Sequence, residues 1–189
     1  MKHRLIALAA AVVALAVSSS AIAASMTSCN EAMTNFKKLG NVSELLGQAY
    51  GYAVLPTIGK GGVGIGGAAG SGCVFAGGKH TGDVSMGQLS IGWQLGGQAY
   101  SPLMLFQNDD TYKEFTKGNF EFGADATAVA LTYGASASAG TQGATSTAGD
   151  TSGKGVWRRG MAIFTLAKGG LMYEAVLAGQ KYNFKPLGE

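Results

Sequence analysis

The chain is organised around one glycine-rich stretch, which reads Pro56-Thr-Ile-Gly-Lys-Gly-Gly-Val-Gly-Ile-Gly-Gly-Ala-Ala-Gly-Ser-Gly-Cys-Val74. At its centre, glycines alternate with Val63 and Ile65, which is the two-residue period of a β-strand. Because glycine is costly inside a strand, such a run indicates that another group approaches the backbone closely. That group is a packed helix, a neighbouring strand or a ligand. Between an N-terminal helix and a phosphate ligand, we expect the helix.

The N-terminus has the pattern of an export signal. Lys2 and Arg4 precede an apolar run over residues 5–17, and the small residues 21–23 follow it. The run is too short to span a bilayer comfortably. We expect cleavage after Ala23, which leaves residues 24–189 as one domain.

The charge balance argues against a nucleic-acid partner. The chain carries a formal net charge of +3, and this falls to +1 without Lys2 and Arg4. A nucleic-acid-binding domain is expected to have a clear basic excess. An anionic partner would therefore have to be held by a local patch of cations.

The two cysteines, Cys29 and Cys73, leave three alternatives open. A disulfide between them would stabilise an exported chain by about 4 kcal/mol in the chain-entropy model. Cys29 could instead carry a lipid, although it lies well beyond the apolar run. The third alternative is two separate buried thiols.

Local patterns predict a small α+β domain. Capping boxes at Ser28 to Glu31 and Asn41 to Glu44 begin two N-terminal helices, and a third short helix follows Asn108. Strands are expected over residues 89–99, 101–107 and 120–133, with a final hairpin over 156–166 and 171–182. Residues 135–155 form a flexible low-complexity loop. We predict a single sheet-dominated domain of about seven mostly antiparallel strands, with short helices at the N-terminus and in the middle.

Motifs for catalysis or cofactor binding are weak. Residues 62–67 satisfy G-x-G-x-x-G, but the glycine-rich sequence after them cannot begin the helix that a dinucleotide site requires. His80 is the one histidine in residues 24–189, and no nucleophile-elbow motif accompanies it. A zinc site would need His80, Cys29 and Cys73, whose spacing in sequence does not fit one. We therefore expect no enzyme activity, no catalytic residues, no metal and no cofactor.

Four ordered segments of the chain resemble the glycine-rich signature of the SYLF domain family: residues 56–74, 90–98, 123–128 and 168–171. The resemblance spans about residues 49–182 and implies a lipid-binding module. Eukaryotic members bind phosphoinositide membranes, a fungal branch also binds actin filaments, and bacterial members are typically exported. Because export would remove this chain from cytosolic actin, an actin partner is not expected. Anionic lipid at a membrane surface is the expected partner.

The candidate lipid-binding residues are cations and one aromatic residue. Lys60 matches the motif of the family, whereas the others are proposed from composition: Lys37, Lys38, Arg158, Arg159 and Trp157. Each cation near an anionic surface contributes about 1 kcal/mol, so charge alone gives weak binding. These residues could equally be solvated surface charges.

The alternative function is an outer-membrane β-barrel or a structural protein of the cell envelope, which the 31 glycines and alternating strands also fit. We expect the protein in the periplasm or at the outer membrane, with secretion and lipid anchoring as alternatives.

Overall fold

The computed structural model describes residues 24–63, 65–91, 98–122, 129–131, 144–145, 157–168 and 179–188. The predicted signal peptide, residues 1–23, lies outside this part of the chain. Of the predicted low-complexity loop over residues 135–155, only Ala144–Thr145 is described, as a short strand.

The described strands form one curled sheet in the order β5-β9-β3-β2-β1-β4-β8-β6-β7. All of its pairings are antiparallel except that between β6 and β8. The predicted α+β class, dominated by a largely antiparallel sheet, is confirmed. The strands are β1 Gly51–Val63, β2 Ile65–Ala76, β3 Lys79–Ile91, β4 Gln98–Phe106, β5 Phe120–Glu121, β6 Val129–Leu131, β7 Ala144–Thr145, β8 Met161–Lys168 and β9 Lys181–Pro186.

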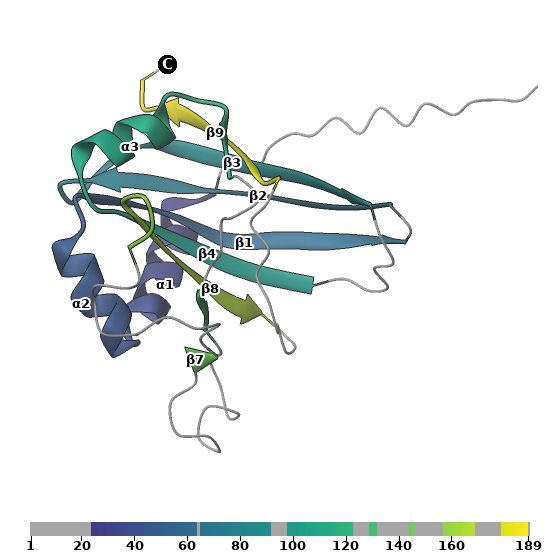
Figure 1. Cartoon of the computed structure of the whole chain (residues 1–189), viewed down its shortest axis with the longest axis horizontal. Helices are drawn as coiled ribbons and strands as arrows, with labels where there is room; N and C mark the ends of the chain where they lie inside the picture. Colours follow the sequence, from purple (N-terminus) through teal and green to yellow (C-terminus); the bar gives the residue numbers. More distant parts are fainter. Residues whose placement is uncertain are drawn as a thin grey trace, which may run out of the picture.

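Three short helices cover one end of the sheet (Figure 1). Helices α1 (Met26–Lys37) and α2 (Gly40–Gln48) lie on one face, and α3 (Asp109–Thr116) lies on the other. The α1 N-cap is Ser25, upstream of the predicted Ser28, and its side chain accepts a hydrogen bond from the Ser28 amide. The predicted cap of α2 is wrong, because Leu39 occupies the N-cap position without a side-chain bond.

Each face of the sheet has its own hydrophobic core, and strand β4 contributes to both. Tyr100, Met104 and Phe106 point to the α3 face, whereas Leu103 and Leu105 point to the α1–α2 face. All five side chains are buried. This is the two-residue alternation of a strand that is covered on both sides.

The glycine-rich stretch is two strands rather than one. Chain reversal between Val63 and Ile65 pairs Gly62 with Gly66 and Gly61 with Gly67. A single strand through this stretch, which the two-residue period predicts, is therefore wrong. The pattern is symmetrical about the reversal, so its two-residue period continues through the hairpin and hides the turn.

A bulge in β1 explains the close approach to the glycines. The register between β1 and β2 shifts between Val54 and Thr57, which bends and twists the bulged strand. A Cβ added to Gly72 would lie 2.1 Å from the Val54 carbonyl oxygen, and one added to Gly70 would lie 2.5 Å from that of Thr57. The approaching group is thus the neighbouring strand, and the expectation of a packed helix is wrong at these positions.

Two further strand boundaries differ from the prediction. The expected strand over residues 89–99 corresponds to the end of β3 and the start of β4, and residues 92–97 lie outside the described chain. The first strand of the expected final hairpin corresponds to β8, whereas residues 169–178, which include its turn and most of its second strand, lie outside the described chain. Strand β8 lies between β4 and β6, whereas β9 pairs with β3 and β5. Alternation predicts strands but does not say which strands are neighbours.

The two cysteines form a disulfide in the structure, which is the first of the three alternatives. The Cys29 and Cys73 sulfurs are 2.07 Å apart, and the bond joins α1 to β2. Both residues are fully buried in the core beneath α1 and α2. The disulfide therefore fastens the N-terminal helix to the centre of the sheet.

Strands β1, β2 and β3 continue beyond the helices (Figure 1). We call this part the extended end of the sheet and define it as residues 59–63, 65–69 and 87–91. Within the described residues, no helix combines the length and apolar character needed to cross a membrane.

Candidate functional site

Lys60 lies at the extended end of the sheet. It pairs with Ala68 on one side and with Gln98 on the other, and its side chain is partly buried. Strand alternation places it on the same face as Ile58, which belongs to the α3-side core.

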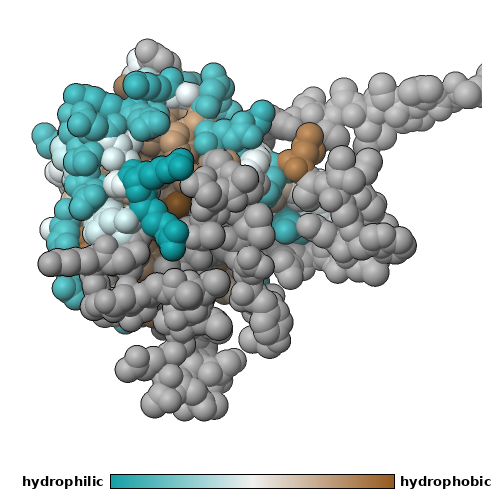
Figure 2. All heavy atoms as spheres, in the orientation of Figure 1, coloured by the Kyte–Doolittle hydropathy of each residue, from teal (hydrophilic) through white to brown (hydrophobic). Residues whose placement is uncertain are grey.

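Two residues that the sequence analysis missed lie at the same end of the sheet but on the opposite face from Lys60, because strand register aligns Lys168 with Gly59 and Leu89 with Gly61. Lys168 ends β8, and its Nζ donates a hydrogen bond to Thr57 Oγ1 at 2.8 Å. Leu89 on β3 is 87% exposed, the highest value among the large hydrophobic side chains of the described chain. Hydrophobic atoms stand out on the extended strands in Figure 2, away from the mostly hydrophilic helix-covered end. No local sequence pattern marks either residue, because strand register alone brings both to this end of the sheet.

Three glycines share the face of Lys168 and Leu89. A Cβ added to Gly59, Gly61 or Gly87 would meet nothing within 4 Å. The space above their Cα atoms on this face is therefore open, although their backbones are paired within the sheet. This end of the sheet combines Lys168, the exposed Leu89 and open glycines on one face with Lys60 on the other.

Arg158 and Arg159 lie in a tight turn at the opposite end of the sheet. The Arg158 amide donates to the Met161 carbonyl at 2.8 Å, and the Met161 amide donates back at 2.9 Å. Arg159 and Gly160 between them have φ values of 50° and 76°, as in a type I′ turn. Both arginine side chains are exposed.

The conformation of Arg159 is unusual for its residue type. A left-handed backbone costs a non-glycine residue roughly 1–2 kcal/mol, and type I′ turns favour Asn, Asp and Gly at this position. Conformations of this kind often occur at functional sites. A hydrogen bond also ties the turn to the residue after β4, since the Gln107 amide donates to the Gly160 carbonyl at 2.8 Å.

The other predicted site residues lie on the α1–α2 side. Trp157 is half-buried and packs against the core beneath those helices. Lys37 and Lys38 are exposed at the C-terminal end of α1, where Lys38 Nζ donates to Asn35 Oδ1 at 3.3 Å.

The predicted cations do not form one cluster. Arg158 precedes β8 at the level of Gly51, whereas Lys60 lies at the far end of β1. At 3.3 Å per residue, the rise from Gly51 to Lys60 is about 30 Å. One lipid head group cannot contact both, so the prediction of a single small cluster is wrong. Sequence could not decide this, because Lys60 and the arginines are separated by several strands whose order only the fold defines.

A buried polar group connects distant strands on the α3 face. Gln180 Nε2 donates to the Tyr100 hydroxyl at 3.1 Å, and the Tyr182 hydroxyl donates to Gln180 Oε1 at 2.6 Å. Tyr100 and Tyr182 lie on β4 and β9, which three strands separate in the sheet, so their proximity reflects its curl. Burial raises the pKa of Tyr100 to about 12, and burial together with Tyr100 raises the pKa of Tyr182 well above its usual value.

Comparison with known proteins identifies the family of this chain. Residues 87–183, more than half of the chain, match the family described as "Ysc84: Las17-binding protein actin regulator". The chain belongs to this family, which is the SYLF domain family that its glycine-rich segments resemble. Membership supports a lipid- or actin-related binding role. A search of the curated proteins found no match.

Proposed function

We propose that this chain binds anionic phospholipid or phosphoinositide head groups at a membrane surface, after export, and that it performs no chemical conversion. The observation that carries the proposal is the family match over residues 87–183. That range includes Leu89, both arginines and Lys168. The export signal expected in residues 1–23 supports a location in the periplasm or at the outer membrane.

The extended end of the sheet, together with Lys168 at the end of β8, is the part that we assign to the membrane, and it would meet the membrane edge-on so that cations on both faces contribute. Lys60 and Lys168 would each contribute about 1 kcal/mol at an anionic surface. Insertion of the Leu89 side chain would add about 1.5–3 kcal/mol. The total of about 3.5–5 kcal/mol corresponds to a dissociation constant near the millimolar range. Stable attachment would then require several copies on one membrane.

The test is co-sedimentation of residues 24–189 with vesicles. The signal segment is omitted because its apolar run would itself enter a bilayer. We expect binding to increase with the fraction of anionic lipid and to fall with salt, because charges are screened over about 10 Å at 0.1 M ionic strength. No binding at any anionic fraction in low salt would refute the proposal.

Variants separate the two ends of the sheet. Replacing Lys60 and Lys168 together by Gln should weaken binding by about 2 kcal/mol, or roughly 30-fold. Lys117→Gln is the matched control, since Lys117 is an exposed lysine that follows α3. If the Arg158→Gln/Arg159→Gln pair abolished binding and the lysine pair did not, the membrane surface would be the arginine turn.

The family description names an actin regulator, so an actin-related partner is the alternative to lipid. Export argues against a cytosolic filament, so we expect no co-sedimentation with filamentous actin under the conditions in which vesicles bind. Actin binding without vesicle binding would replace the lipid proposal.

A further inference from the structure

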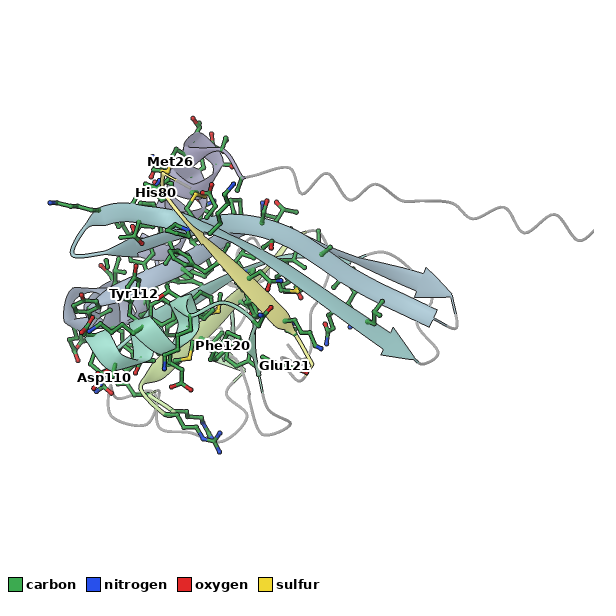
Figure 3. The ribbon with its side chains drawn as sticks, turned by 90° about the horizontal axis from the view of Figure 1, so that it is seen from above. Met26, His80, Asp110, Tyr112, Phe120 and Glu121 are labelled. Atoms are coloured by element: carbon green, nitrogen blue, oxygen red, sulfur yellow. A yellow bond between two sulfur atoms is a disulfide. The ribbon has the colours of Figure 1, made fainter. Side chains whose placement is uncertain are left out.

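Three metal-ligating residues meet on neighbouring positions of β2 and β3, and the disulfide attaches a fourth residue from α1. Strand register places Asp83 opposite Cys73 and His80 opposite Phe75. One ligand atom each from Cys73, His80 and Asp83 lies within 4.8 Å of the other two. Cys29 is not in this group of three, but its Sγ is bonded to Cys73 Sγ and lies 2.07 Å from it. In Figure 3, His80 lies at the same end of the molecule as Met26, the first residue of α1.

The histidine nitrogen in this cluster is not satisfied by the protein. His80 Nε2 is buried and has no hydrogen-bond partner. It lies 3.2 Å from Asp83 Oδ1 as an ion-pair contact, without the geometry of a hydrogen bond. A buried polar atom without a partner is rare and calls for an explanation such as a bound ion. The side chains of His80 and Asp83 are 19% and 38% exposed, so an ion can reach them from solvent.

We propose that the dithiol form of this chain binds a divalent transition metal of the zinc type through Cys29, Cys73, His80 and Asp83. Two sulfurs, one imidazole nitrogen and one carboxylate oxygen are a ligand set that zinc accepts in tetrahedral geometry. Zinc–ligand bond lengths of about 2.0–2.3 Å require an N···O separation of about 3.3 Å and an S···S separation of about 3.8 Å. The 3.2 Å between His80 Nε2 and Asp83 Oδ1 already meets the first requirement.

The disulfide and the metal exclude each other. The two sulfurs, 2.07 Å apart when bonded, must separate by about 1.7 Å to become two ligands. Every newly made chain has free thiols before its disulfide forms. A reducing dithiol can restore them by giving two electrons and two protons to the disulfide and becoming a disulfide itself. On metal binding, both thiols lose their protons to solvent, and the zinc ion keeps its oxidation state.

Ring packing positions one ligand of the site. The contact between the Phe75 and His80 rings, with centroids 5.3 Å apart, holds the imidazole beside the cluster. The site is therefore assembled by packing that exists before the metal binds.

The experiment titrates the full chain with Co²⁺, a spectroscopic substitute for zinc, without oxygen and with a phosphine reductant. We expect thiolate-to-cobalt charge transfer and the visible bands of tetrahedral cobalt, and both should disappear when Zn²⁺ is added. The oxidised chain should show neither signal. His80→Gln and Asp83→Asn should each weaken Co²⁺ binding at least 10-fold. Glu121→Gln, which changes an exposed carboxylate paired with Lys181, should leave binding unchanged.

Each alternative result is decisive. No cobalt uptake by the folded, reduced chain would overturn the proposal. Charge transfer that is unchanged in His80→Gln and Asp83→Asn would also overturn it, because the metal would then bind the sulfurs alone. If the reduced chain does not fold by itself, Zn²⁺ should restore the far-ultraviolet circular dichroism of the wild type but not of Asp83→Asn. Failure to restore it would count against the site.

Discussion

The substitution Gly72→Ala tests the account of the glycine-rich strands most directly. The new Cβ would lie 2.1 Å from the Val54 carbonyl oxygen and 2.7 Å from Leu55 Cα, whereas ordinary contact begins near 3.4 Å. The β1 backbone would have to move by about 1.3 Å. It cannot do so freely, because β1 is paired with β2 and β4 and the Leu55 side chain is fully buried.

Overpacking in a core typically costs 1–3 kcal/mol and occasionally more. Because the clash here is with backbone, we expect a loss of about 3–4 kcal/mol in the free energy of unfolding. For a domain of this size, each 1 kcal/mol changes Tm by about 2–4 °C, so Tm should fall by about 6–16 °C. The measurement is thermal and urea unfolding followed by circular dichroism.

The matched control is Gly61→Ala at the extended end. A Cβ added there meets nothing within 4 Å, so the substitution should stabilise the chain by about 0.5–1 kcal/mol through the entropy of the unfolded state. If Gly72→Ala were neutral, or if Gly61→Ala were as damaging, close approach of β1 would not be the reason for the glycines. Weaker vesicle binding by a stable Gly61→Ala variant would show that the open face above Gly61 contacts the head groups.

Three further predictions concern stability. Replacing Cys29 and Cys73 together by Ala removes a cross-link between residues 44 positions apart. The free energy of unfolding should fall by about 4 kcal/mol, and Tm should fall by about 8–16 °C. An unchanged Tm would contradict the link between α1 and the sheet. The folded-state pKa of Tyr100, about 12, lies above the usual value near 10, so the contribution of Tyr100 to stability should be constant below pH 10 and fall by up to about 1.4 kcal/mol per pH unit from 10 to 12. Tyr100→Phe should therefore reduce the slope of stability against pH in alkaline unfolding titrations. Asn108→Ala removes the side chain that accepts from the Thr111 amide at 2.9 Å, and the loss of this N-cap should cost about 1 kcal/mol in urea unfolding.

Local rules predicted the class of this protein. Two-residue alternation in residues 101–107 gave a strand that the structure has as β4, and the helix expected after Asn108 is α3. Such patterns depend on side chains near one another in sequence, so they survive in the fold. The glycine-rich segments likewise indicated the family before any contact was known.

Pairing and proximity were decided by the tertiary structure. The reversal between Val63 and Ile65, the position of β9 beside β3, and the separation of Lys60 from Arg158 all follow from strand order. The sequence analysis set aside a zinc site because Cys29, Cys73 and His80 are badly spaced along the chain. Folding places Cys73, His80 and Asp83 within 4.8 Å of one another and bonds Cys29 to Cys73. Spacing along the chain decides whether residues can share a metal only when they lie on the same helix or strand. Here the fold brings together residues from one helix and two strands.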